Sequence, residues 1–164
     1  RELERREGEY QAISAALEGL KAANAQLQER FSPELNRWAA DYLSRLTGGR
    51  YRELSLDREL DASAMEGSGV LPRRALFLSK GTVDQIYLAV RLAVYDLCLK
   101  ERRAPLVLDD ALAAFDDGRM ALALDLLAQL AEDRQILLFT CQSREAACLS
   151  GRPEVTIQSL PARA

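Results

Sequence analysis

Two stretches of the sequence decide the fold: Leu78-Ser79-Lys80-Gly81-Thr82-Val83-Asp84-Gln85 and Pro105-Leu106-Val107-Leu108-Asp109-Asp110-Ala111-Leu112-Ala113-Ala114-Phe115-Asp116-Asp117. The first predicts a Ser-x-Gly turn that opens an apolar helix over residues 82–101. Free backbone N–H groups at a helix N-terminus can bind phosphate oxygens, and glycine lets a phosphate approach the backbone closely. The second predicts a buried strand, 106–109, that ends in two carboxylates suited to a metal ion and an attacking water. Taken alone, either motif is common, because most such turns only cap helices and paired acids are frequent in turns.

The segments around these motifs alternate between strand and helix patterns. A hairpin is predicted from residues 51–56 and 60–64, a short strand or extended lead-in at 74–78, a helix at 117–130, a strand at 135–140, a short helix at 144–148 and a final edge strand at 155–160. Short apolar strands between helices are typical of a mostly parallel sheet covered by helices. The predicted fold class is therefore α/β.

The N-terminal residues carry a heptad pattern with apolar positions spaced three and four apart. Its members are Tyr10, Ile13, Leu17, Leu20, Leu27 and Phe31, with the polar Asn24 completing the series. The pattern fits either one amphipathic helix packed on a globular body or the end of a coiled-coil stalk whose partner strand lies outside this chain. Ser32-Pro33-Glu34 predicts a bend and a helix restart, and Gly48-Gly49 predicts its end. We divide the chain into a stalk end with the helix that leads into the lobe, 1–48, and a lobe, 49–164.

Composition narrows the function. The chain has 164 residues, is 48% hydrophobic and has a net charge of -3, which argues against a protein that coats nucleic acid over its whole surface. It contains no histidine, so carboxylates are the only plausible metal ligands. Cys98, Cys141 and Cys148 are expected to be reduced, buried thiols rather than a disulfide or zinc framework. A long apolar run and a signal-peptide pattern are both missing, so we expect a cytoplasmic protein with no membrane contact. The charged helical pattern at Arg1 leads us to expect a fragment.

The two motifs and a third stretch resemble the nucleotide-binding motifs of DNA-repair ABC-type ATPases. The stretch from Leu78 to Val94 resembles the signature motif and its helix. The acid pair, Asp109 and Asp110, followed by five residues and then Asp116, resembles the Walker B motif and the D-loop. The stretch 135–142 resembles the switch strand, with Gln142 where most members have histidine. The resemblance is closest to the SbcC and YhaN-like branch of the SMC-type ATPases.

This resemblance implies the C-terminal lobe of an ABC-type (P-loop NTPase) head that works with ATP and Mg²⁺. Asp109 would bind the metal, and Asp110 and Gln142 would be catalytic for the nucleotide of their own head. Ser79, Lys80, Gly81 and Asp116 would bind the nucleotide of the opposite head. Asp110 stands where most relatives have glutamate. Lys80 replaces a glycine, and its charge lies either near the triphosphate or, as we favour, in solvent.

The sequence lacks a GxxxxGK[ST] phosphate loop. The resemblance implies that an N-terminal lobe of the same protein carries it, that heads form homodimers on ATP, and that hydrolysis moves the stalk in DNA double-strand-break repair or DNA processing. DNA and a metallophosphoesterase nuclease are candidate partners. Arg91 is either a relay to the stalk or to DNA, or a surface residue. The alternatives are a non-catalytic coiled-coil assembly module built on a degenerate head and an ordinary α/β domain with accidental spacings.

Overall fold

The computed structural model describes residues 2–57, 61–102 and 104–160. The chain divides into two compact units, residues 1–34 and 35–164, each of which is described by itself below. Within the described residues, no helix combines the length and apolar character needed to cross a membrane. The division into a stalk end, 1–48, and a lobe, 49–164, stays a prediction.

Helix α1 covers Glu2–Leu46, with Pro33 inside it. The helix restart predicted at Ser32 is therefore wrong. Proline fits the helical φ and removes one backbone hydrogen bond, so the chain can stay helical across it. In the second unit, the last turns of α1 pack into the core, where Tyr42, Leu43 and Leu46 are buried.

In the first unit, four of the heptad side chains of α1 are open to solvent. The side chains of Tyr10, Ile13, Leu17 and Leu20 are between 51% and 72% exposed. A seam of this kind gains stability only when a second helix covers it. Among the described residues of the first unit, no such helix is present.

We therefore expect the isolated chain to self-associate through residues 10–31, because burying this seam removes apolar surface from water. Sedimentation equilibrium should show an average mass that rises with concentration, and Leu17→Lys should shift the chain toward monomers. Ala15→Lys, at a position outside the seam, is the matched control and should leave association unchanged. A strictly monomeric chain at high concentration would contradict the prediction.

The second unit begins with an antiparallel sheet. Strand β1 (Tyr51–Leu56) pairs with β2 (Ala62–Glu66), and β2 pairs with the two-residue β3 (Arg73–Arg74). The predicted hairpin is present, although residues 58–60 at its tip lie outside the described residues. The strand predicted at 74–78 is wrong beyond Arg74, because a 3₁₀ turn, η1 (Ala75–Phe77), leads into the next helix.

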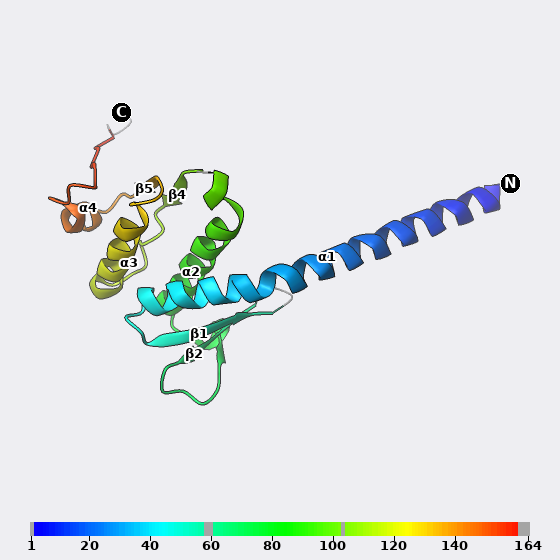
Figure 1. Cartoon of the computed structure of the whole chain (residues 1–164), viewed down its shortest axis with the longest axis horizontal. Helices are drawn as coiled ribbons and strands as arrows, with labels where there is room; N and C mark the ends of the chain where they lie inside the picture. Colours follow the sequence, from blue (N-terminus) through cyan, green and yellow to red (C-terminus); the bar gives the residue numbers. More distant parts are fainter. Residues whose placement is uncertain (1, 58–60, 103, 161–164) are drawn as a thin grey trace. The chain divides into compact units, whose positions relative to one another are not determined.

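Helix α2 and the elements after it complete the unit. The turn and helix predicted to be the signature motif, and the loop predicted to be the D-loop, keep these names below. Helix α2 is Lys80–Cys98, followed by the 3₁₀ turn η2 (Lys100–Arg102), strand β4 (Leu106–Asp109), helix α3 (Asp117–Leu130), strand β5 (Ile136–Phe139) and helix α4 (Ser143–Leu149). Strands β4 and β5 are parallel, with Asp109 opposite Phe139. This strand–helix–strand arrangement is visible in Figure 1 and confirms the predicted α/β class.

The final strand predicted at residues 155–160 is wrong. In the described part of the chain these residues form no strand, and Ile157 and Leu160 are exposed. Alternating apolar residues favour extended backbone, but a strand also needs a neighbour whose backbone groups are free to pair.

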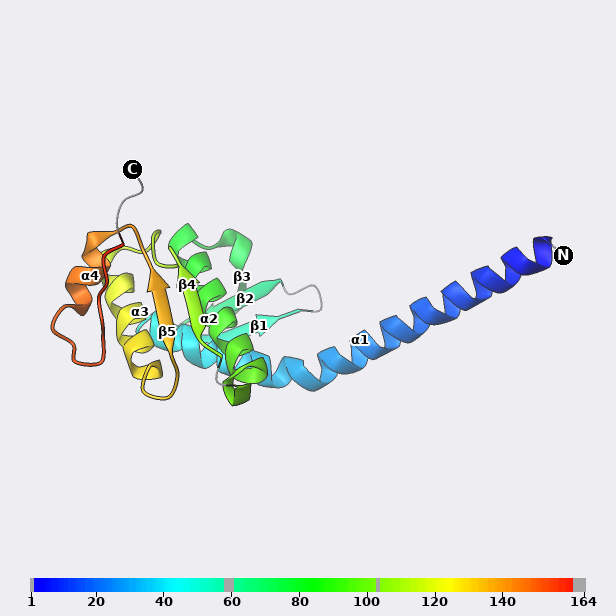
Figure 2. The ribbon, with the colours of Figure 1, turned by 90° about the horizontal axis from the view of Figure 1, so that it is seen from above.

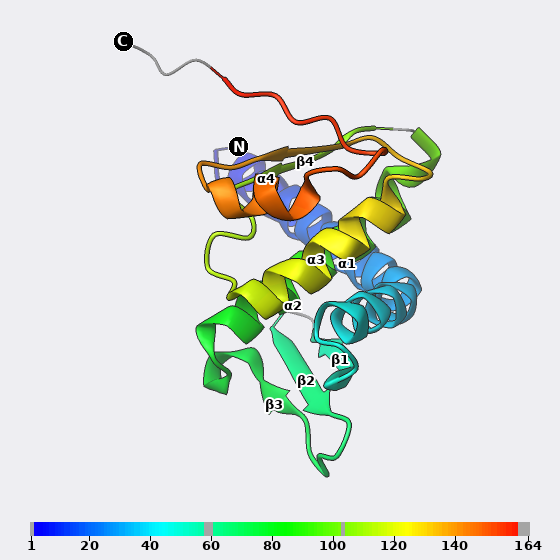
Figure 3. The same cartoon turned by 90° about the vertical axis from the view of Figure 1, so that its left-hand side faces the viewer.

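Within the described residues, the parallel strands β4 and β5 are covered on one face. Figures 2 and 3 show α2 and α3 on the same side of this strand pair. Leu106 and Leu108 of β4 are buried toward these helices, whereas Val107 is 56% exposed and Phe139 of β5 is 45% exposed. We call the outward face formed by Val107, Leu137 and Phe139 the open face. Apolar strands that the sequence pattern predicts to be buried on both sides are thus half-covered in this chain.

The expectation that the cysteines are buried is wrong. Cys98 and Cys141 are exposed, and Cys148 is half-buried; all three are free thiols.

Candidate functional site

The signature turn lies at the N-terminus of α2. Ser79 is the N-cap residue: its backbone is extended, and its hydroxyl accepts a hydrogen bond from the backbone N–H of Thr82 at 3.4 Å. The hydroxyls of Ser79 and Thr82 lie 2.8 Å apart. Ser79 and Lys80 are exposed, while Gly81 is buried. A helix N-terminus with an exposed serine is a suitable surface for an anion.

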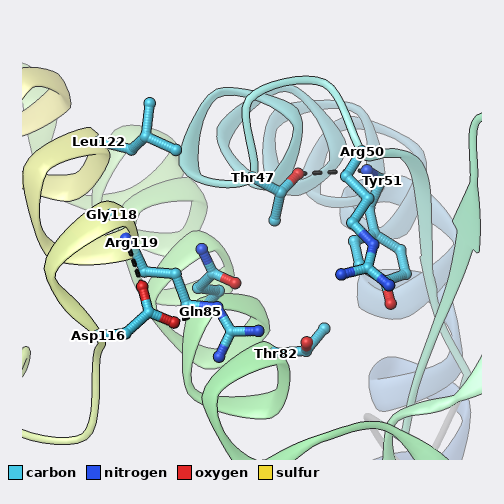
Figure 4. A pocket seen from close by; sticks show the side chains of 9 residues that line it. All are labelled: Thr47, Arg50, Tyr51, Thr82, Gln85, Asp116, Gly118, Arg119 and Leu122. Atoms are coloured by element: carbon cyan, nitrogen blue, oxygen red, sulfur yellow. Dashed lines mark hydrogen bonds and ion pairs between the residues drawn. The ribbon is translucent and has the colours of Figure 1, made fainter.

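Two hollows flank the first turns of α2. One, of about 300 Å³, is lined by Thr82 and Gln85 of α2 together with Asp116 and Arg119 (Figure 4). Gln85 is buried and donates a hydrogen bond to the carbonyl of Leu46 at 2.6 Å, which fixes α2 to the end of α1. The second hollow lies between α2 and the acid pair.

This second hollow, of about 340 Å³, is lined by Lys80, Asp84 and Arg91 of α2 and by both residues of the acid pair. The signature helix therefore presents one face toward the acid pair and another toward the D-loop aspartate. Lys80 shares the hollow of Asp109 and Asp110, and Asp116 lies in the other one.

The acid pair ends β4. Asp109 is the last residue of the strand and is exposed. Asp110 follows with a φ of 46°, in the left-handed region that aspartate tolerates better than most residues. Its backbone N–H donates to the carbonyl of Phe139 at 2.9 Å, and its Oδ1 accepts from the N–H of Cys141 at 3.3 Å. The backbone of β5 thus holds the second carboxylate in place.

Gln142 lies next to the same loop. Its Nε2 donates to the carbonyl of Ala113 at 3.4 Å, and its Oε1 accepts from Nε of Arg144 at 2.6 Å. Because β4 and β5 are parallel neighbours, their carboxyl ends lie at one edge of the sheet, where α/β proteins bind ligands. The structure therefore brings the acid pair and Gln142 to one place. Their catalytic and metal-binding roles stay predictions.

The sequence analysis missed Arg144, which fixes the D-loop. Its guanidinium donates to the carbonyl of Phe115 at 2.8 Å and forms an ion pair with Asp117 at 3.1 Å. It also holds Gln142, so one side chain joins the switch position to the D-loop. The only sequence signal is an arginine two residues after Gln142, and no spacing rule singles it out.

Asp116 begins α3 as its N-cap residue. Its Oδ1 accepts from the backbone N–H of Arg119 at 2.9 Å, and its Oδ2 lies 3.5 Å from Nε of the same arginine. The exposed carboxylate faces the hollow beside Thr82 and Gln85 (Figure 4). Arg119 is the second residue that the sequence analysis missed, because an i, i+3 pair of charges is common on helices.

The donor set at the acid pair fits a magnesium ion that arrives with a nucleotide. In the described residues, no group of three or more Asp, Glu, Cys or His could hold a metal alone. Mg²⁺ is commonly bound by one or two carboxylates, with phosphate oxygens and waters as its other ligands. Two adjacent carboxylates at the end of β4 meet that requirement.

Comparisons with known proteins identify one sequence relative and several structures of similar fold. No protein-family profile matches the chain. It is 34% identical over 110 residues to the uncharacterized protein YhaN of Bacillus subtilis (strain 168); the match covers 66% of this chain and 11% of YhaN. The chain thus spans about a tenth of that relative's length.

Similar solved structures are head domains of SMC proteins. One, from work on ATP-driven dimerization and DNA-stimulated activation of SMC ATPases, has a TM-score of 0.63 at 17% identity over 77% of this chain and 78% of that chain. The Pyrococcus yayanosii Smc head with a coiled coil and joint has a TM-score of 0.59 at 17% identity, covering 88% and 29% of the two chains. The Thermotoga maritima SMC head has a TM-score of 0.57 at 19% identity, covering 76% and 44%. The chain therefore has the α/β fold of an SMC-type ABC ATPase head, consistent with its C-terminal lobe.

Proposed function

We propose that this chain is the C-terminal half of an ATP-binding and hydrolysing head of the SbcC and YhaN-like type. The observation that carries the proposal is the meeting of the acid pair with Gln142 at the carboxyl ends of β4 and β5. This edge offers carboxylates for a metal-bound triphosphate and a side-chain amide that can donate to phosphate. The SMC head fold and the similarity to YhaN support it.

Each proposed role follows from the chemistry of the residue. Asp109 binds Mg²⁺, whose charge offsets that of the phosphate oxygens. Asp110 orients and polarises the attacking water, and its φ of 46° turns it away from the line of the strand. Gln142 donates a hydrogen bond to phosphate but cannot take up a proton. Ser79, Gly81 and Asp116 bind the nucleotide of the opposite head. Lys80 is exposed, as expected of a charge in solvent, but it also lines the hollow of the acid pair, and this position supports the alternative role near the triphosphate.

We further propose that a lobe carrying the phosphate loop covers the open face. Val107, Leu137 and Phe139 form an apolar surface on a parallel strand pair, and such pairs are normally covered on both faces. The same lobe would supply the second helix of the α1 seam. ATP would then join two heads, and its hydrolysis would release them and move the stalk. This cycle would take place in the cytoplasm, in DNA double-strand-break repair or DNA processing. Its partners would be DNA and a metallophosphoesterase nuclease.

The test is ATP-dependent dimerisation of this chain reunited with the phosphate-loop lobe. ATP should convert monomeric heads into dimers in light scattering, and Ser79→Arg should abolish the conversion, because a larger cation blocks the turn where phosphate approaches. Ser150→Arg, at an exposed position after α4, is the matched control and should leave dimerisation intact. Heads that neither bind ATP nor change assembly would refute the proposal.

One observation favours the non-catalytic assembly module as a second candidate. Asp110 Oδ1 and both polar atoms of the Gln142 amide already have hydrogen-bond partners within the lobe. In such a module these contacts would only stabilise the loop, and the exposed α1 seam would be the functional part. ATP-driven dimerisation without any turnover, in the unmodified reunited head, would favour this candidate.

A further inference from the structure

The guanidinium of Arg119 lies directly against the signature turn. Arg119 belongs to the first turn of α3, and Gly81 belongs to the first turn of α2. A Cβ atom placed on Gly81 would overlap Nη1 of Arg119. Figure 4 shows the side chain of Arg119 reaching from α3 toward α2. The missing side chain of Gly81 is therefore what makes room for the arginine.

This position is electrostatically unusual. The N-terminal ends of both α2 and α3 carry partial positive charge, so a cation between them is disfavoured unless an anion is close. Asp116 supplies one anionic partner, with 3.5 Å between its Oδ2 and Nε of Arg119. Its carboxylate is 65% exposed, and an exposed pair of this kind contributes little stability. The side chain of Arg119 is 27% exposed, so a second anion can reach its guanidinium. Binding of that anion would be favoured, because it would offset the positive charge of the arginine and of the two helix N-termini.

We propose that Arg119 is a phosphate-binding residue for the nucleotide that the signature turn receives from the opposite head. This inference rests on the proposed function. Asp116 orients the guanidinium through Nε, and the terminal Nη groups donate hydrogen bonds to phosphate oxygens beside Ser79. Arginine suits this task because its planar group can donate two parallel hydrogen bonds to one phosphate.

The first experiment uses the reunited heads and measures the ATP concentration at half-maximal dimerisation. Arg119→Gln should raise that concentration roughly 10- to 100-fold, the value of one lost charge-assisted hydrogen-bond pair. Arg119→Lys should recover part of the loss, because the charge remains and the two-pronged geometry does not. Arg152→Gln is the matched control, since Arg152 pairs with Asp125 on the exposed side of α3.

A second variant keeps Arg119 in the sequence but moves its guanidinium. Gly81→Ala should push Nη1 away from the turn, and the unfolding free energy should not fall, since alanine favours the helical backbone more than glycine. The half-maximal ATP concentration should nevertheless rise as it does for Arg119→Gln. Normal ATP-driven dimerisation of both variants would overturn the inference.

Mixing two variants tests whether Arg119 acts across the dimer. Asp110→Asn heads lack their own catalytic acid, and Arg119→Gln heads lack the residue offered to their partner. At an ATP concentration that dimerises unmodified heads but not Arg119→Gln heads, neither variant alone turns over ATP at the normal rate. A mixed dimer concentrates both defects in one nucleotide site and leaves the other intact. Random pairing of equal amounts should therefore restore turnover up to about a quarter of the unmodified value, because at most half of the dimers are mixed and each has one intact site.

The two proposals fail in different ways. If Ser79→Arg prevents dimerisation but mixing restores no turnover, Arg119 does not act across the dimer and the inference is wrong while the head function stands. If Ser79→Arg leaves ATP-driven dimerisation unchanged, the signature turn does not bind the opposite nucleotide, and the inference is wrong while ATP-driven dimerisation itself stands. If the unmodified reunited heads neither bind ATP nor dimerise, the proposed function fails and the inference fails with it.

Discussion

Asp110→Asn is expected to lower the ATP turnover of the reunited head by roughly 10²–10⁴-fold, the usual contribution of a positioned acid or base. Asparagine keeps the size of the side chain and still accepts a hydrogen bond from Cys141 N–H, but it removes the negative charge that polarises the attacking water. It also tolerates the φ of 46°, so the backbone between β4 and the D-loop should stay unchanged. The measurement is steady-state phosphate release.

ATP-driven dimerisation should survive in the same variant, because the signature turn and Asp109 are intact. The dimers should therefore persist instead of dissociating after hydrolysis. Asp125→Asn, on the exposed face of α3, is the matched control for the loss of one carboxylate and should turn over normally. Turnover that remains near normal in Asp110→Asn would show that another group activates the water.

Sequence reasoning predicted the elements whose signals are local. The N-cap Ser79, the apolar run of α2 and the carboxylates after β4 each specify their structure within a few residues. The prediction failed where partners decide the outcome. Residues 155–160 have a strand-like pattern but form no strand, and Pro33 carries a helix-start pattern but lies inside α1.

The candidate site shows the same limit. The acid pair and Gln142 could be predicted to meet, because parallel neighbouring strands bring their carboxyl ends together. Arg119 and Arg144 could not, because their roles depend on contacts with Gly81 and with the carbonyl of Phe115, 38 and 29 residues away along the chain. Single arginines carry no period or motif that would identify such contacts in advance.

The largest stability effect is expected at a buried ion pair that joins three elements of the lobe. Asp96 of α2 and Arg134, between α3 and β5, are 2.7 Å apart, and their side chains are 3% and 4% exposed. The hydroxyl of Tyr42 on α1 donates to the other oxygen of Asp96, and burial together with this hydrogen bond raises the pKa of Tyr42. The phenol therefore stays protonated and remains a donor.

Asp96→Leu should lower the unfolding free energy by about 3–5 kcal/mol, because the buried guanidinium of Arg134 loses its buried partner and keeps only the half-exposed Asp133, 2.9 Å from its Nε. Denaturant unfolding of the whole chain measures this loss. Asp125→Leu, which breaks the exposed pair with Arg152, is the matched control and should cost less than about 1 kcal/mol.

The double variant Asp96→Leu with Arg134→Leu separates two reasons for such a loss. If the cost of Asp96→Leu comes from an unpaired buried charge, removing Arg134 as well should recover much of it, since apolar groups can replace a buried ion pair. If the double variant is as unstable as the sum of the single variants, packing rather than charge decides the loss. With the Tyr42 hydroxyl, the pair joins α1, α2 and the segment just before β5. A double variant that is as stable as the unmodified chain and still dimerises poorly on ATP would show that the ion pair also positions the signature helix relative to the end of α1.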